Sequence, residues 1–80
     1  MKIPVIKKLV ETQPLEQLQA AELAIINEQP LPIEIEGSDE GEQLTHAIAA
    51  IWILERMNDG NMDFKTALRE YTQKVRESIN

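Results

Sequence analysis

The stretch AIAAIWIL, at residues 47–54, decides the fold. In an α-helix these eight residues occupy every side, and a helix that is apolar all round is one that is buried on all sides. Ser38 or Asp39 is expected to cap the N-terminus of this helix, and Asp39 with Glu42 three residues later approximates a capping box. Gly60 predicts its end, since glycine is the residue most often found just past a helix C-terminus. We therefore expect a central helix over residues 39–58.

Two further helices are expected, one before and one after the central helix in the sequence. The first begins at Thr12 or Gln13, with Pro14 in its first turn, where a missing N–H costs nothing. It runs to about Glu28, because Pro30 forbids its continuation. The other begins near Asp63 and shows an apolar stripe at spacings of three and four, formed by Phe64, Ala67, Leu68, Tyr71 and Val75.

Two short segments near residues 3–8 and 31–36 are expected to be extended, and they can pair with each other. For Val5 to Val10 the sequence also permits a helix. Residues 31–36 alternate, with Leu31, Ile33 and Ile35 on one side and two glutamates on the other, which is the pattern of a half-buried strand. An extended loop that lays the same three side chains on the helices fits equally well. The expected fold class is mainly α, a three-helix single domain spanning residues 1–80.

Size and composition exclude several classes of protein. With 80 residues the chain is near the lower limit for folding alone, and it has no cysteine for a disulfide, a thiol nucleophile or a zinc–thiolate site. Its net charge is −6, which disfavours nucleic acid and anionic membranes as partners. Its longest apolar run is far shorter than the roughly 20 residues that span a bilayer. These features agree with a cytoplasmic protein.

One candidate metal site joins Glu42 and His46. They lie four residues apart on the central helix, close enough to bind one metal ion, and carboxylate and imidazole ligands at such spacings occur in metal sites. Acidic residues at a helix start are also expected for capping and dipole reasons alone. On that second interpretation His46 is a half-exposed residue with no ligand, and no cofactor is expected.

Further candidates are two glutamates and a row of cations. Glu22 and Glu55 fall within the apolar faces of their helices, so they either share a proton, bind a cation, pair with lysine or arginine, or reach water at the edge. Lys65, Arg69 and Arg76 align along one side of the last helix. They can grip an acidic partner, or the acidic segment 34–42 of this or another chain, or they are simply a solvated flank.

The sequence resembles a group of short bacterial proteins of unknown function. The resemblance is carried by MKIPVIKKL at residues 1–9, EGEQLTHA at residues 40–47 and DFKTAL at residues 63–68. It implies a stand-alone bacterial cytoplasmic protein and supplies no activity or catalytic residue.

No phosphate-binding glycine loop is present, and no Ser-His-Asp or Cys-His arrangement is recognisable in the sequence. We therefore predict a non-enzymatic interaction module, acting as a homodimer that covers the rest of the central helix, with another protein as a possible partner. Within that helix Ile51 is expected at the centre of the core. The alternatives are a protein that binds a small ligand or metal through its acidic residues, and an enzyme with a carboxylate site at the dimer interface.

Overall fold

The protein, seen in a computed structural model that describes residues 1–79, is built from four helices over that range. They are α1 (Ile3–Thr12), α2 (Leu15–Ile26), α3 (Glu40–Gly60) and α4 (Phe64–Ile79). The mainly helical fold expected from the sequence is confirmed. The expected number of helices was one too low, because residues 3–8 form a helix and not an extended segment.

The apolar spacing of α1 explains this correction. Its buried side chains are Val5, Ile6, Leu9 and Val10. Residues at positions i, i+1, i+4 and i+5 lie on one side of a helix. In a strand, residues i and i+1 would point to opposite faces. The helix ends at Thr12 because Pro14 disfavours the helical conformation for Gln13, which is extended at φ −118° and ψ 138°.

Pro14 ends α1 and also starts α2. It is the N-cap residue, extended at φ −72° and ψ 156°, and its carbonyl accepts a hydrogen bond from the Leu18 N–H at 3.2 Å. The helix therefore begins at Leu15, two or three residues later than expected, and it ends at Ile26, two residues earlier. Glu28 then takes a positive φ of 56°, which turns the chain away from the helix axis.

The caps of α3 follow the sequence closely at its start and differ at its end. Asp39 Oδ1 accepts a hydrogen bond from the Glu42 N–H at 2.8 Å, and the Glu42 carboxylate accepts one from the Ser38 N–H at 2.8 Å. This is the reciprocal bonding of a capping box, displaced by one residue on the carboxylate side. At the other end Gly60 remains helical, and Asn61 takes the left-handed conformation at φ 50°.

The segment 31–36 is an extended loop, and no strand occurs among residues 1–79. Its alternation was predicted correctly, since Ile35 is buried and Leu31 and Ile33 pack against the core, while Glu34 and Glu36 are exposed. Its backbone is bonded to α3 side chains: Gln43 donates to the Ile35 carbonyl at 3.0 Å. A strand partner is therefore unnecessary, because side chains of a helix occupy the backbone acceptors.

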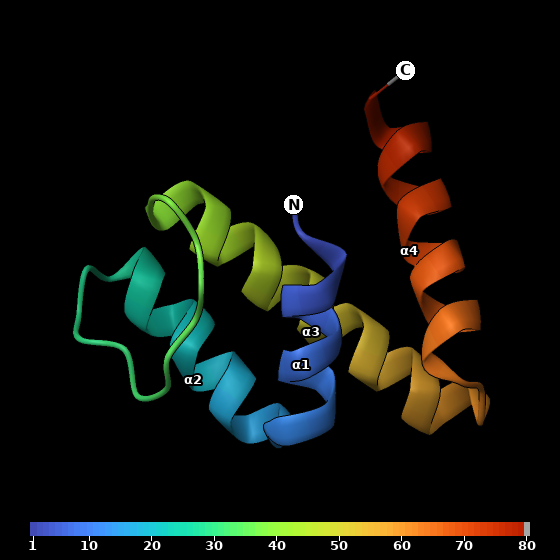
Figure 1. Cartoon of the computed structure of the whole chain (residues 1–80), viewed down its shortest axis with the longest axis horizontal. Helices are drawn as coiled ribbons and strands as arrows, with labels where there is room; N and C mark the ends of the chain where they lie inside the picture. Colours follow the sequence, from blue (N-terminus) through green and yellow to red (C-terminus); the bar gives the residue numbers. More distant parts are fainter. Residues whose placement is uncertain (80) are drawn as a thin grey trace.

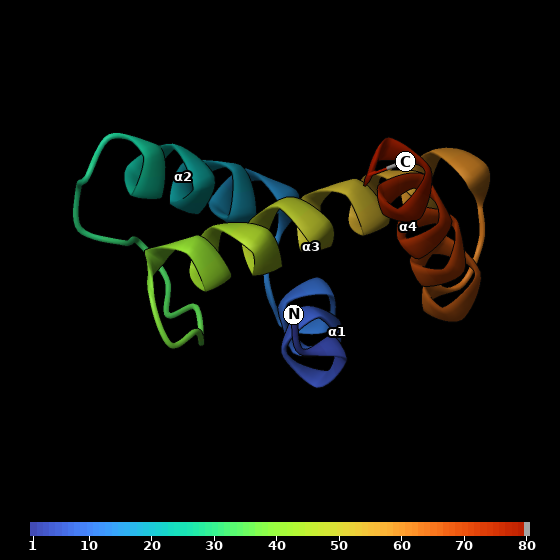
Figure 2. The ribbon, with the colours of Figure 1, turned by 90° about the horizontal axis from the view of Figure 1, so that it is seen from above.

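The three other helices all pack against α3. Figure 1 shows α1 crossing in front of it, α2 beside it, and α4 at its C-terminal end, far from α2 and the loop. In Figure 2 the same chain is seen from above, with α2 and α1 on opposite sides of α3. Ala47, Ala49 and Ala50 are fully buried on α3, and these small side chains allow close approach of its neighbours.

The side of α3 that faces the core differs from the one expected. Ile53 is fully buried, whereas Ile51 is only partly buried and Ile48 is 39% exposed. The prediction that Ile51 lies at the centre of the core was therefore wrong. The helix is not covered on all sides by the rest of the chain, so part of its apolar surface is open to another molecule.

The loop makes a close approach to α3 at Gly37, and this gives a test of the packing. A Cβ atom at this position would lie 2.8 Å from the Gln43 backbone nitrogen, so either the loop or the start of α3 would have to move. At Gly41 a Cβ atom would meet nothing closer than 3.4 Å. We expect Gly37→Ala to lower the free energy of unfolding by about 1–3 kcal/mol.

Gly41→Ala is the matched control for this prediction. It makes the same chemical change in the first turn of α3, where alanine is favoured over glycine by up to about 1 kcal/mol. Urea denaturation of both variants compares them directly. Equal stability of the two would contradict the close contact.

Candidate functional site

His46 is the best-defined polar centre of the chain. It is fully buried, and both ring nitrogens are hydrogen-bonded to backbone. The Lys2 N–H donates to Nε2 at 2.9 Å, and Nδ1 lies 2.7 Å from the Glu36 carbonyl oxygen. Because Nε2 accepts, the ring proton of the neutral form sits on Nδ1 and is donated to Glu36. His46 thus ties the start of α1 and the loop to α3. The expectation that it would be half-exposed was wrong.

The Glu42 carboxylate has local partners as well. It accepts the hydrogen bond from the Ser38 N–H, and its other oxygen lies 4.0 Å from the N-terminal amine of Met1. The Ser38 bond and the nearby positive charges of Lys2 and the N-terminus lower the pKa of Glu42. A lowered pKa stabilises the folded chain above the ordinary titration range of glutamate, and this contribution is lost as the pH falls.

This geometry gives the Glu42 and His46 pair an anchoring role. Neither ring nitrogen of His46 has a lone pair left for a metal while the two backbone bonds are made. No cluster of three or more histidine, aspartate or glutamate side chains within residues 1–79 is arranged to hold a metal ion. The sequence signal for a metal pair and that for a buried anchor are the same, namely an acid and a histidine one turn apart at a helix start.

The other two candidate carboxylates occupy different environments. Glu22 on α2 is partly buried, and Glu55 on α3 is exposed. No hydrogen bond or ion pair involves either side chain among the described residues. The apolar face of α3 is therefore narrower than the sequence indicated, and Glu55 lies outside it. Glu22 lies at the edge of the core.

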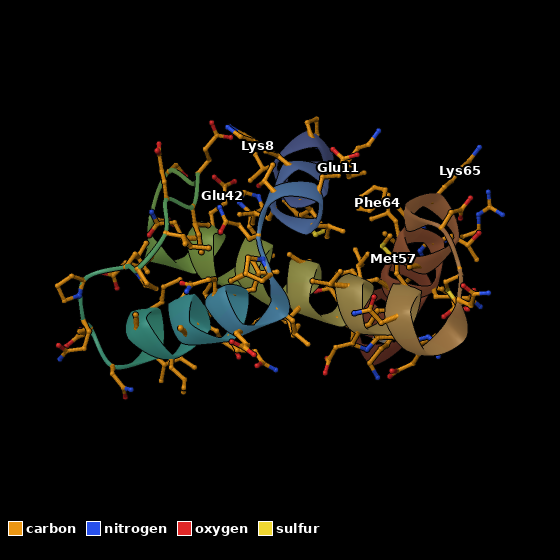
Figure 3. The ribbon with its side chains drawn as sticks, turned by 90° about the horizontal axis from the view of Figure 1, so that it is seen from below. Lys8, Glu11, Glu42, Met57, Phe64 and Lys65 are labelled. Carbon is orange, nitrogen blue, oxygen red and sulfur yellow. The ribbon has the colours of Figure 1, made fainter. Side chains whose placement is uncertain are left out.

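The three aligned cations of α4 all lie at the surface. Lys65, Arg69 and Arg76 are exposed, and we call them the basic stripe. In Figure 3 Lys65 points away from the rest of the chain, whereas Phe64, beside it, points back toward the body of the molecule. None of the three forms an ion pair with another described residue. The acidic segment 34–42 of the same chain lies at the opposite end of the molecule from α4 (Figure 1).

A link between α3 and α4 was not found from the sequence. The Arg56 guanidinium donates to the Glu70 carboxylate at 2.9 Å. This bond raises the pKa of Arg56 further above its ordinary value. The Trp52 and Tyr71 rings pack nearby, with centroids 5.6 Å apart. The residues of each pair are 14 and 19 positions apart in the sequence, so no local spacing indicates either contact.

The most exposed of the large apolar side chains described in the structure lie on α2. Leu23 and Ile26 are each 58% exposed. At 100° per residue they point away from the buried Leu18 and Ala21, together with Glu16 and Gln19, and Glu22 lies at the edge of this surface. We call the surface formed by Glu16, Gln19, Glu22, Leu23 and Ile26 the α2 outer face. It combines exposed hydrophobic side chains with negative charge.

Hollows of about 170 Å³ to about 590 Å³ lie in the surface, and each is open to solvent and lined at least in part by polar side chains. One lies between α1 and the loop and has a volume of about 170 Å³; its lining includes Lys8, Glu34 and Glu36. All three of these charged side chains are exposed. Sites for small organic ligands usually enclose about 300–1,000 Å³ with a mostly apolar lining. The α2 outer face and the basic stripe are therefore the more distinctive surfaces.

Comparison with known proteins places the chain in a family. The model of a "Family of unknown function (DUF6952)" matches residues 1–80, the whole sequence. The chain belongs to this family. No curated protein and no solved structure matches this chain.

Membership of DUF6952 confirms the resemblance to short proteins of unknown function. It assigns no activity, ligand or partner, so the role of each residue rests on its geometry. None of the helices described over residues 1–79 is long and apolar enough to cross a membrane.

Proposed function

We propose that this chain is a non-enzymatic interaction module that associates with a second copy of itself. The observation that carries the proposal is the exposure of Leu23 and Ile26, at 58% each, on the α2 outer face. Two large aliphatic side chains one turn apart make an apolar patch that is costly to leave in water. Ile48, 39% exposed on α3, adds to the uncovered apolar surface.

Size supports the same proposal. Small domains bury a smaller fraction of their surface than large ones, and without disulfides oligomerisation is a common way to gain stability. Symmetric homodimers are also the most frequent soluble assembly. We take the chain to act in the cytoplasm, as the resemblance to short bacterial proteins implies.

The experiment is size-exclusion chromatography with multi-angle light scattering over micromolar to millimolar concentrations. A chain of 9.1 kDa should give a mass that rises to at least twice this value. The variant Leu23→Ser/Ile26→Ser should shift the mass toward the monomer and keep its helical circular dichroism, since both side chains already lie mostly in water. A monomeric wild-type chain at every concentration would overturn the proposal.

A further inference from the structure

The C-terminal half of α4 extends beyond α3, the helix that covers the first half of α4. Ala67 and Tyr71 are buried, but every side chain from Gln73 to Glu77 is exposed. Figure 1 shows this part of α4 standing away from the body of the molecule, and we call residues 73–77 the α4 arm. Val75 lies one turn after Tyr71 on the same side and is 36% exposed. The apolar stripe of α4 therefore continues past the residues that cover it.

Positive charge runs beside this uncovered stripe. Lys65, Arg69 and Arg76 are separated by four and seven residues, so they lie within about 40° of one another around the helix. Arg76 lies within the α4 arm, and Arg69 lies one turn before its start. The arm and the turn before it thus present one exposed apolar side chain with two guanidinium groups that have no carboxylate partner among residues 1–79.

The α2 outer face has the complementary character. Leu23 and Ile26 supply its apolar surface, and Glu16 and Glu22 supply negative charge on the two sides of it. No lysine or arginine occurs between Lys8 and Arg56, whereas ten acidic residues occur there. α2 therefore carries negative charge and no positive charge of its own, and such a helix attracts a cationic one.

The two surfaces cannot meet within one chain. α2 and the α4 arm lie on opposite sides of the molecule in both ribbon views (Figures 1 and 2), and the longest dimension of the chain is 32 Å. A contact between them has to join two molecules. Contacts of like surfaces are disfavoured, because two α2 outer faces would bring carboxylates together and two arms would bring guanidinium groups together.

We infer that the α4 arm of one copy docks on the α2 outer face of a second copy. This inference rests on the proposed self-association and names the surfaces that form it. Val75 packs on Leu23 and Ile26, and the basic stripe pairs with Glu16 and Glu22. Apolar contacts between amphipathic helices supply affinity, and the opposite charges fix the orientation and speed the encounter.

A charge exchange between two variants tests this arrangement. Arg69→Glu/Arg76→Glu makes the arm acidic, and Glu16→Lys/Glu22→Lys makes the α2 outer face basic. Alone, each variant should associate at least about tenfold more weakly than wild type, because like charges then face each other. An equimolar mixture should recover association, since both the acidic arm on the basic face and the basic arm on the acidic face are then favourable. Sedimentation equilibrium of each sample measures the dissociation constants.

The control is Lys7→Glu/Lys8→Glu on α1, which makes the same change in net charge as the arm variant at exposed positions far from the α4 arm. It should leave the dissociation constant within about twofold of wild type. Thermal melts establish that each variant is folded, and Arg69→Gln/Arg76→Gln, which should also weaken association, replaces the arm variant if that variant unfolds.

The outcomes separate the two proposals. A wild-type dimer whose association is unaffected by the arm and α2 variants would overturn the docking arrangement and leave the homodimer standing. Failure of the mixture to recover association would overturn it as well. A monomeric wild type would overturn the homodimer and the docking together.

Discussion

Ile53→Asp should abolish cooperative folding, whereas Ile48→Asp should leave the helical fold intact. Ile53 is fully buried at the core of α3, and Ile48, five residues earlier on the same helix, is 39% exposed. An unpaired carboxylate in the core costs several kcal/mol, and a chain of this length has a total stability of about 4–12 kcal/mol. At Ile48 the new carboxylate reaches water and loses little solvation.

Far-UV circular dichroism and thermal denaturation measure this difference. The pair is closely matched, because residue type, substitution and helix are the same and only the direction of the side chain differs. A cooperative melt of Ile53→Asp within a few degrees of wild type would show that the core lies elsewhere. Loss of structure in Ile48→Asp would show that this side of α3 is covered.

The same pair of residues shows why the sequence located α3 and misplaced its core face. Eight consecutive apolar residues identify a buried helix, and its caps fix where it starts. They carry no polar position to mark the outward side, so the pattern cannot tell Ile51 from Ile53. The choice is made by α1, α2 and α4, which are distant in sequence, and by alanines that allow close approach on one side only.

For α1 the sequence pattern permitted a helix, but in so short a segment it also permitted a strand. Val5, Ile6, Leu9 and Val10 fit one helical face, yet the β-branched residues and Pro4 also suit an edge strand. In the structure the segment is helical, and its expected partner, the loop at residues 31–36, is bonded to α3 side chains.

Among the candidate site residues, position on a helix was predictable and surroundings were not. The alignment of the basic stripe follows from the helical period alone. The burial of His46 does not, because it depends on Lys2 and Glu36, which are 44 and 10 residues away. Long-range contacts of that kind leave no periodic signal in one sequence.

The second large effect is expected at His46 itself. His46→Leu fills a similar volume but leaves the Lys2 N–H and the Glu36 carbonyl without their partner. Each unsatisfied buried group costs about 1–3 kcal/mol, and the Lys2 amide, which belongs to an exposed residue, regains some water. We expect the variant to lower the free energy of unfolding by about 2–4 kcal/mol, measured by urea denaturation.

His46→Gln is the matched control, because its amide supplies both a donating NH2 group and an accepting oxygen, as the neutral imidazole supplies a donor and an acceptor. It can bond both the Glu36 carbonyl and the Lys2 N–H, and we expect a loss of about half that of leucine or less. Hydrogen exchange at the Lys2 amide gives an independent readout of the anchor, and it should accelerate in His46→Leu more than in His46→Gln. If leucine proved as stable as wild type, packing and not the two backbone bonds would hold α1 and the loop against α3. If glutamine proved as damaging as leucine, the ring shape of His46 would matter more than its hydrogen bonds.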